Sequence, residues 1–361
     1  MTLFFLIAKA LIILFGIVVA LSVWIVLFNT RAMLREASAR KDRTALRESI
    51  LGYLRGEIHV SAFSSIAPNK EDLLIGLVAQ IAEEYGESAR QKLIYIFETT
   101  GTHHIVQNEL KQLSESKSWH KRQRTATYLP YIAINHVIVP PLLRALEDKV
   151  LMVRFSAAHS LAKIRATEAI VPILEKIALP ARWPIERTIE ILIEMNSDAV
   201  DTLLEYLLFP GAKPDSKIYA ISALGIQHSR KALPAILTYL NDSNKEIRIH
   251  SARALGNIVS PEALSALFKS MHDSDWEVRA ACARSLGLLK ERSAIPFLVE
   301  GLGDSAWWVR YNSADSLAEI GEDGLKALKE AFTHDDKFAR NISRQVLQER
   351  NILKSDQGVA Q

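Results

Sequence analysis

The sequence predicts an all-α protein: a right-handed α-solenoid of stacked helical hairpins, preceded by one N-terminal transmembrane helix. Alanine, leucine and isoleucine dominate a chain of 361 residues that is 49% hydrophobic and 24% charged, and few segments alternate with the period of a strand. Residues 10–30 carry no charge. Over the rest of the chain, a Val-Arg or Ile-Arg pair recurs with a spacing of 31 residues.

The uncharged run predicts an uncleaved membrane anchor over residues 1–30. As a helix that rises about 1.5 Å per residue, residues 10–30 match a hydrocarbon layer of about 30 Å. A cleaved signal peptide has a shorter apolar core and a small-residue cleavage site, which the following "VLFNTRAML" lacks.

Residues 31–58 are predicted to form a basic juxtamembrane helical linker. Between residues 31 and 55 the chain has seven Lys or Arg against three acidic residues. The positive-inside rule therefore places the C-terminal body in the cytoplasm, and a periplasmic body is the alternative. We expect anionic lipid to bind near Arg31–Arg47. Since the whole chain carries +3 and residues 1–55, including Lys9, carry +5, residues 56–361 sum to −2, which disfavours a nucleic-acid groove.

Residues 59–353 contain the repeat, and residues 354–361 are expected to be a disordered tail. Arg248, Arg279 and Arg310 mark its register, with an aspartate six residues before and a leucine seven residues after each of them. Looser copies of this marker residue are Arg90, Arg122, Arg154, Arg187, Lys217 and Arg340. Apolar residues spaced i, i+3, i+4, i+7 form a second stripe in each unit, near Pro172, Pro234 and Pro296.

Each unit is thus a helix, a short turn and a second helix that begins after the aspartate. Such a unit cannot bury its apolar stripe alone, so about eight or nine units must stack. Small residues four positions after the marker let the second helices approach closely, at Ala126, Ala158, Ala252, Ala283 and Ala314.

Segments such as "DSDWEVRAACARSLGLLKERSAIPFLVEGL" resemble the HEAT-repeat family, in the short form found in phycobilin lyases. This resemblance covers most of the chain and implies a protein-binding scaffold without enzymatic activity. The same subtype also allows a lyase or isomerase of a bilin-like chromophore, although no suitable polar constellation is found. No catalytic, cofactor or metal motif occurs, and the single Cys282 is expected to be a buried, inert residue.

A narrower resemblance is to bacterial membrane-anchored HEAT proteins. It rests on the N-terminal helix, the basic collar, Trp307–Arg310 with Ala314, Leu317 and Gly321, and Phe338–Arg340. Such proteins look like companions of processive family-2 glycosyltransferases. The resemblance implies a single-pass protein of the bacterial inner membrane whose partner is a cell-envelope glycosyltransferase. We expect the concave surface formed by the second helices to hold the partner.

Two sets of residues are candidates for the site. Trp307 shares its repeat position with Trp276 and Trp119, which is typical of packing between repeats or of a ridge, whereas Trp308 replaces a mostly polar residue. We expect partner binding at Trp308, Tyr311, Trp307, Trp276 and Trp119. The alternative for Trp308 is that its ring covers the C-terminal end of the repeat array. A structural ladder, in which aspartates cap helices and pair with arginines of adjacent units, is expected from Asp148, Arg154, Asp242, Arg248, Asp273, Arg279, Asp304 and Arg310. The alternative is that these arginines bind an anionic ligand.

Overall fold

The computed structural model describes the backbone of residues 2–99, 102–176 and 185–353, and all regular structure in these ranges is helical. Side chains of residues 2–15, 17–20, 32, 99, 176 and 185 lie outside the description, as does the predicted tail at 354–361. The chain divides into two compact units. Unit 1 contains Met1–Gln112 and Tyr131–Ile134, and unit 2 contains Leu113–Pro130 and Asn135–Gln361.

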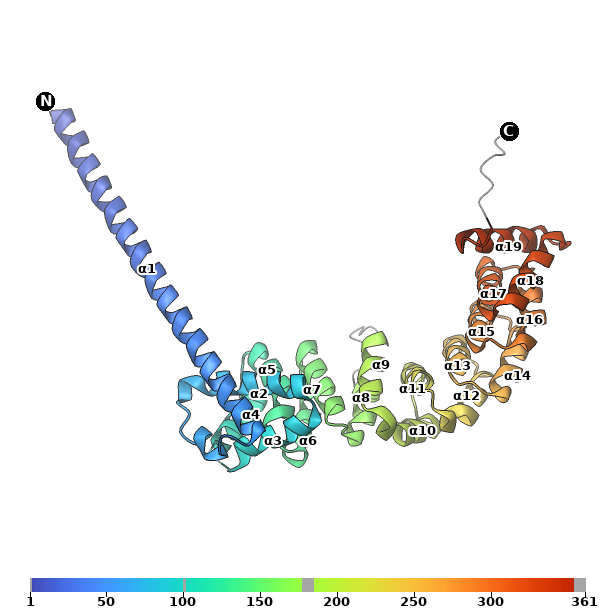
Figure 1. The fold of residues 1–361 in the computed structure, drawn as a ribbon, viewed down its shortest axis with the longest axis horizontal. Helices are drawn as coiled ribbons and strands as arrows, with labels where there is room; N and C mark the ends of the chain where they lie inside the picture. The colour runs from blue at the N-terminus through green and yellow to red at the C-terminus, as the bar shows by residue number, and fades with distance from the viewer. Residues whose placement is uncertain (1, 100–101, 177–184, 354–361) are drawn as a thin grey trace. The chain divides into compact units, whose positions relative to one another are not determined.

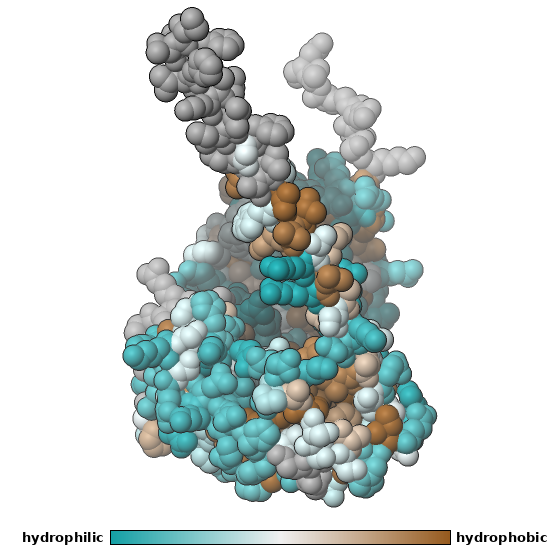
Figure 2. All heavy atoms as spheres, turned by 90° about the vertical axis from the view of Figure 1, so that its left-hand side faces the viewer, coloured by the Kyte–Doolittle hydropathy of each residue, from teal (hydrophilic) through white to brown (hydrophobic). Residues whose placement is uncertain are grey.

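Unit 1 begins with one helix of 54 residues, α1 (Thr2–Arg55), and no break separates the predicted anchor from the predicted linker. Within the predicted span at residues 10–30, the side chains of residues 10–15 and 17–20 lie outside the description. Among the residues that are described, no helix combines the length and the apolarity needed to cross a membrane. Figure 2 shows apolar side chains on the surface of the described part of α1, beside hydrophilic ones.

The C-terminal part of α1 packs against α2 (Glu71–Tyr85) and α3 (Glu87–Thr99), which α4 (His103–Glu115) follows. Short 3-10 turns at Val60–Phe63 and Pro68–Lys70 connect α1 to α2. Ile50 of α1 is fully buried, and the guanidinium of Arg47 lies 2.7 Å from the Glu84 carboxylate. The end of the predicted linker is therefore part of the folded unit.

In the described ranges, the eighteen helices α2 to α19 follow one another along the chain, the number that nine helical hairpins require. In unit 2 the first helices of the pairs are α6 (Asn135–Ala145), α8 (Ile170–Lys176), α10 (Val200–Leu208), α12 (Leu233–Tyr239), α14 (Pro261–Ser270), α16 (Ile295–Gly301) and α18 (Glu322–Glu330). The second helices are α5 (Trp119–Ile132), α7 (Leu151–Lys163), α9 (Ile185–Glu194), α11 (Pro214–Ile226), α13 (Lys245–Asn257), α15 (Trp276–Leu289), α17 (Trp307–Ile320) and α19 (Lys337–Glu349).

Within unit 2, each second helix packs against the second helix of the next pair, in series from α11 to α19 (Figure 1). The leucines seven residues after the marker form the core between the two helix layers. Seven of them have no exposed surface, namely Leu129, Leu161, Leu224, Leu255, Leu286, Leu317 and Leu347. Burying a leucine side chain of this kind contributes about 2 kcal/mol.

Small residues set the close spacing of the second helices. The alanines four positions after the marker are fully buried. A Cβ atom added to Gly287 would lie 2.9 Å from the backbone Cα of Ser316 on the next second helix. The Ser316 hydroxyl in turn donates a hydrogen bond of 2.9 Å to the carbonyl of Ala283. Ser285 and Ala252 repeat this contact one unit earlier, at 2.8 Å.

Candidate protein-interaction surface

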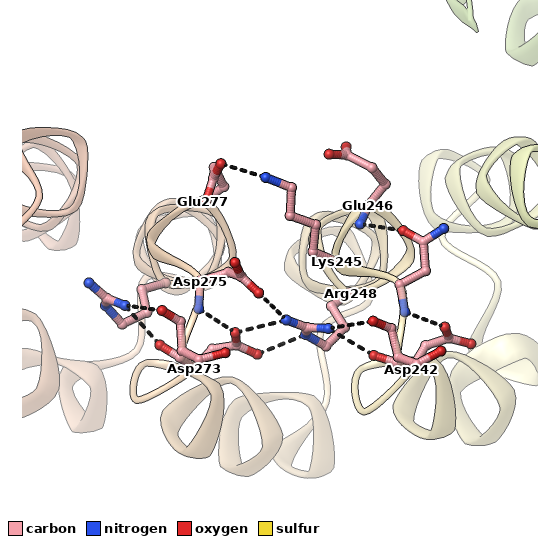
Figure 3. Close-up of polar contacts among 11 residues, drawn as sticks. Asp242, Lys245, Glu246, Arg248, Asp273, Asp275 and Glu277 are labelled. Carbon is pink, nitrogen blue, oxygen red and sulfur yellow. Dashed lines mark hydrogen bonds and ion pairs between the residues drawn. The ribbon is translucent and has the colours of Figure 1, made fainter.

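A polar ladder joins consecutive pairs at the starts of the second helices (Figure 3). The Arg248 guanidinium donates to both carboxylate oxygens of Asp273, at 2.9 and 3.1 Å, and also to Asp275 at 2.6 Å. Arg279 binds Asp304 in the same bidentate way, at 2.7 and 2.8 Å. Bidentate pairs of this kind are strong and orient both side chains.

Each ladder aspartate also holds the turn that starts its own second helix. Asp304 accepts a hydrogen bond of 2.8 Å from the backbone N–H of Ala306, the N-cap residue of α17. Asp148 accepts in the same way from Val150, at 2.8 Å, and pairs with Arg122 at 2.6 and 3.0 Å. The aspartate thus lies two residues before the N-cap and satisfies the N–H of the N-cap residue.

The environment of the ladder keeps its carboxylates charged. Burial would raise the pKa of Asp304, but the hydrogen bonds from Arg279 and the Ala306 N–H outweigh it and hold this pKa below the ordinary value. Asp273 shows the same balance, with Arg248 and the Asp275 N–H lowering its pKa. The third contact of Arg279, from its Nη1 to the carbonyl of Asp273 at 2.8 Å, ties it to its own turn. Its donors are therefore directed at groups of this chain.

The ladder changes at Arg310, because His334 takes the position of the next aspartate. The Nδ1 atom of His334 accepts from the Asp336 N–H at 3.0 Å and so preserves the turn. Arg310 keeps its bond to the carbonyl of Asp304, at 2.8 Å, and its guanidinium lies over the ring of Phe338, 4.7 Å from the centroid. Arg154 likewise bonds to the carbonyl of Asp148, at 2.9 Å.

Three aromatic rings cluster on the first turns of α17. Trp307 and Trp308 meet edge to face, with ring centroids 4.7 Å apart, and Trp307 stacks on Tyr311 at 5.0 Å. The Tyr311 hydroxyl donates to the Glu349 carboxylate at 3.2 Å, which fixes this ring against α19. Trp307 is 42% exposed and Trp308 54%. Both tryptophans therefore lie at the surface. The exposure of Trp307 favours a position on a surface ridge over packing between repeats.

The exposed rings continue onto the neighbouring second helices. Trp276 on α15 is 41% exposed, and Phe338 on α19 is 47% exposed. Trp276 occupies the repeat position of Trp307, and Phe338 that of Trp308. We call Trp276, Trp307, Trp308 and Phe338 the aromatic ridge. Phe338 was not among the predicted binding residues, although its repeat position could have indicated it.

Trp119 lies apart from the aromatic ridge. Its ring is half-buried and stacks on His120 of the same helix, with centroids 3.6 Å apart. It belongs to α5, whereas the ridge lies on α15, α17 and α19. The structure thus brings three of the five predicted binding residues, Trp307, Trp308 and Tyr311, into contact, and places Trp276 on the adjacent second helix α15.

The remaining reactive side chains have structural surroundings. Cys282 is fully buried, and burial raises the pKa of its thiol, so the sulfur stays protonated. His104 on α4 lies 2.9 Å from the Glu71 carboxylate. No cluster of three or more His, Cys, Asp or Glu that could hold a metal ion occurs in the described ranges.

Stacked helix pairs joined by a repeated polar ladder define the chain as an α-solenoid. The sequence profile of HEAT repeats matches residues 108–193, 200–275 and 265–348, which is more than half of the chain, and the chain belongs to the HEAT-repeat family. Members of this architecture offer extended surfaces for protein binding. Among curated proteins, none matches the sequence.

Several solved structures are similar to parts of this chain. Human deoxyhypusine hydroxylase is 16% identical with a TM-score of 0.30, covering 71% of this chain and 99% of its own. The CpcE–CpcF complex of phycocyanin lyase from Nostoc is 18% identical with a TM-score of 0.34, covering 67% and 94%. Kap95p, in a structure with RanGDP, is 10% identical with a TM-score of 0.47, covering 76% and 46%.

Proposed function

We propose that this protein is a non-enzymatic, membrane-anchored scaffold that binds a protein partner through the aromatic ridge. The observation behind the proposal is the exposure of Trp276, Trp307 and Trp308, at 41, 42 and 54%, on adjacent second helices. A large ring at the surface does not gain the stabilising free energy that burial in the core would give it. Aromatic side chains grouped in this way commonly anchor protein interfaces.

The repeat itself does not require these rings. The equivalents of Trp308 in the two preceding units are Glu277 and Glu246, and the equivalent of Trp307 on α13 is Lys245. Lys245 and Glu277 form an ion pair of 2.8 Å on the surface, away from the polar ladder (Figure 3). The fold therefore accepts polar residues here, and the tryptophans need another reason, which partner binding supplies.

The membrane anchor is the second part of the proposal, and its support comes from the uncharged residues 10–30. In the described part of α1, Trp24 and Phe28 are 62 and 60% exposed and stack with ring centroids 5.5 Å apart. Tryptophan is enriched at membrane–water interfaces. An anchor would confine the solenoid near the bilayer and raise its effective concentration for another membrane protein.

The basic residues of the predicted linker fall into two groups, those with a partner in this chain and those without one. Arg40 pairs with Glu36 at 2.6 Å, and Arg43 and Arg47 bind Gln80 and Glu84 of α2 at 2.9 and 2.7 Å. Within the described part of the chain, no such partner is found for Arg31, Arg35 or Lys41. We therefore narrow the predicted lipid contact at Arg31–Arg47 to these three residues.

The positive-inside rule places the solenoid of the proposed inner-membrane protein in the cytoplasm. Protease treatment of spheroplasts tests this orientation, since a cytoplasmic body is protected until the membrane is opened. Digestion of residues 59–353 from the outside would instead support the periplasmic alternative. The resemblance to companions of family-2 glycosyltransferases makes such an enzyme the favoured partner.

Detergent extraction of the tagged full chain, followed by affinity capture and mass spectrometry, tests the scaffold function. We expect a membrane enzyme, with a glycosyltransferase as the favoured identity, and its loss from the Trp308→Ala variant. Leu208→Ala is the matched control, because Leu208 on α10 is 72% exposed and lies outside the ridge. Equal recovery by both variants would refute the role of the ridge. Visible absorbance after co-expression with a bilin would instead support the lyase alternative.

A further inference from the structure

Two exposed arginines lie on the second helices that precede the Trp307–Trp308 pair. Arg253 on α13 and Arg284 on α15 both stand five residues after the ladder arginine of their helix. Both are exposed. Other units carry Ser222, Asp315 or Gln345 at this position, so the repeat does not require a cation there.

These arginines differ from those of the ladder. The ladder side chains Arg248 and Arg279 are only 12 and 14% exposed, and each binds an aspartate. In the part of the chain that the structure describes, the Arg253 and Arg284 side chains have neither a hydrogen bond nor an ion pair. Their guanidinium groups are thus available to a carboxylate of another molecule.

Carboxylates of the same face are mostly engaged elsewhere. Glu277 pairs with Lys245 at 2.8 Å, and both Asp315 and Glu319 of α17 pair with Arg350. Glu246 is exposed on α13, but it lies seven residues before Arg253, about 10 Å along the helix axis. The surface strip that runs from Arg253 on α13 to Arg284 on α15 therefore carries a positive charge, although residues 56–361 together sum to −2.

Apolar surface lies on both sides of this charge. On α15, Trp276 precedes Arg284 by eight residues, about 12 Å along the axis, and the 47% exposed Leu288 follows it by one turn. Exposed guanidinium groups beside apolar surface do not suit a hydrophilic polyanion alone. They suit a peptide whose carboxylates alternate with apolar side chains.

We propose that this strip binds an acidic, extended segment of the protein partner, with its carboxylates on Arg253 and Arg284 and its apolar side chains on Trp276 and Trp307. Adjacent packed helices lie about 8–10 Å apart. An extended chain in the polyproline II conformation rises about 3.1 Å per residue with three residues per turn, so carboxylates three residues apart lie on one face and reach both arginines. This inference rests on the proposed scaffold function and specifies the chemistry of its partner.

A phage-displayed library of random twelve-residue peptides, selected against the detergent-solubilised full chain, tests the inference. The enriched peptides should be acidic, with carboxylates about three residues apart and apolar residues between them. A fluorescein-labelled copy of the most enriched peptide should bind the R253E/R284E variant about tenfold more weakly, because reversal removes two ion pairs and adds repulsion.

A K269E/K329E variant is the matched control, since it makes the same change in net charge at exposed positions on α14 and α18. It should retain peptide binding, and both variants should keep the wild-type melting temperature. Enriched peptides that are not acidic, or that bind the R253E/R284E variant equally well, would overturn the acidic-segment inference but leave the scaffold intact. If no peptide is enriched and affinity capture recovers no partner, both proposals fail.

Discussion

Replacing Arg279 by alanine tests whether the polar ladder stabilises the fold. The substitution removes two hydrogen bonds to Asp304, at 2.7 and 2.8 Å, and those to the carbonyls of Asp273 and Ser274, at 2.8 and 3.3 Å. The Asp304 carboxylate keeps only the N–H of Ala306 among its backbone donors. Its side chain is 12% exposed, so water replaces the lost arginine poorly.

The cost follows from this burial. Removing one partner of a largely buried ion pair destabilises by about 3–5 kcal/mol, because the other charge is left uncompensated. We take the lower end, about 3 kcal/mol, since the pair lies at the edge of the helix layers and not in the core. For a unit of this size, each kcal/mol lowers the melting temperature by about 2–4 °C, which gives a decrease of about 6–12 °C.

Circular dichroism during heating measures the effect, with Arg310→Ala as the matched control. Arg310 has the same bond to its own turn, at 2.8 Å, but contacts the ring of Phe338 in place of an aspartate. Its removal leaves no buried carboxylate unpaired and should cost about 1 kcal/mol. A decrease for Arg279→Ala that is no larger than that for Arg310→Ala would refute the reasoning. Unchanged stability with lost partner binding would favour the anionic-ligand alternative.

Three further substitutions test the packing, the pH response and the ridge. Gly287→Ala should lower the free energy of unfolding in urea by about 1–2 kcal/mol, because the added methyl group overpacks against Ser316 and this cost exceeds the gain in helix propensity. Gly76→Ala is the control and should not destabilise the fold, since no atom lies near its added Cβ. Burial, then Arg253, lowers the pKa of His250 to about 4. Since this pKa is below the unfolded value of 6.5, stability should fall as the pH decreases from about 6.5 to 4, and His250→Gln should flatten that part of the melting-temperature profile. Trp308→Ala should change the melting temperature by less than about 2 °C, since its ring is 54% exposed, and a larger decrease would mean that the ring mainly protects the end of the repeat array.

The repeat could be read from the sequence because it depends on local periodicity. Apolar residues at helical spacing require one buried stripe per helix, and a fixed offset of 31 residues brings Leu255, Leu286 and Leu317 to equivalent buried positions. The same register predicts small residues where second helices meet. Both predictions follow from the period alone, so no knowledge of the particular neighbours was needed.

Contacts between side chains on different helices required the tertiary structure. In the sequence, Arg43 and Arg47 belong to the same basic segment as Arg31 and Arg35. In the structure, Arg43 and Arg47 bind side chains of α2, whereas Arg31 and Arg35 do not. All four residues are arginines, so residue type does not distinguish them. Arg43 and Arg47 differ because each lies beside a polar side chain of α2 that is 37 positions further along the chain.

The aromatic ridge shows the same division. The sequence determined the repeat position of each tryptophan and distinguished Trp307 from Trp308. Only the structure decided that both rings are exposed, that Tyr311 supports Trp307, and that Phe338 extends the ridge. Exposure depends on how adjacent helices pack, because the same position at the start of a helix can be covered or open according to the side chains of its neighbours.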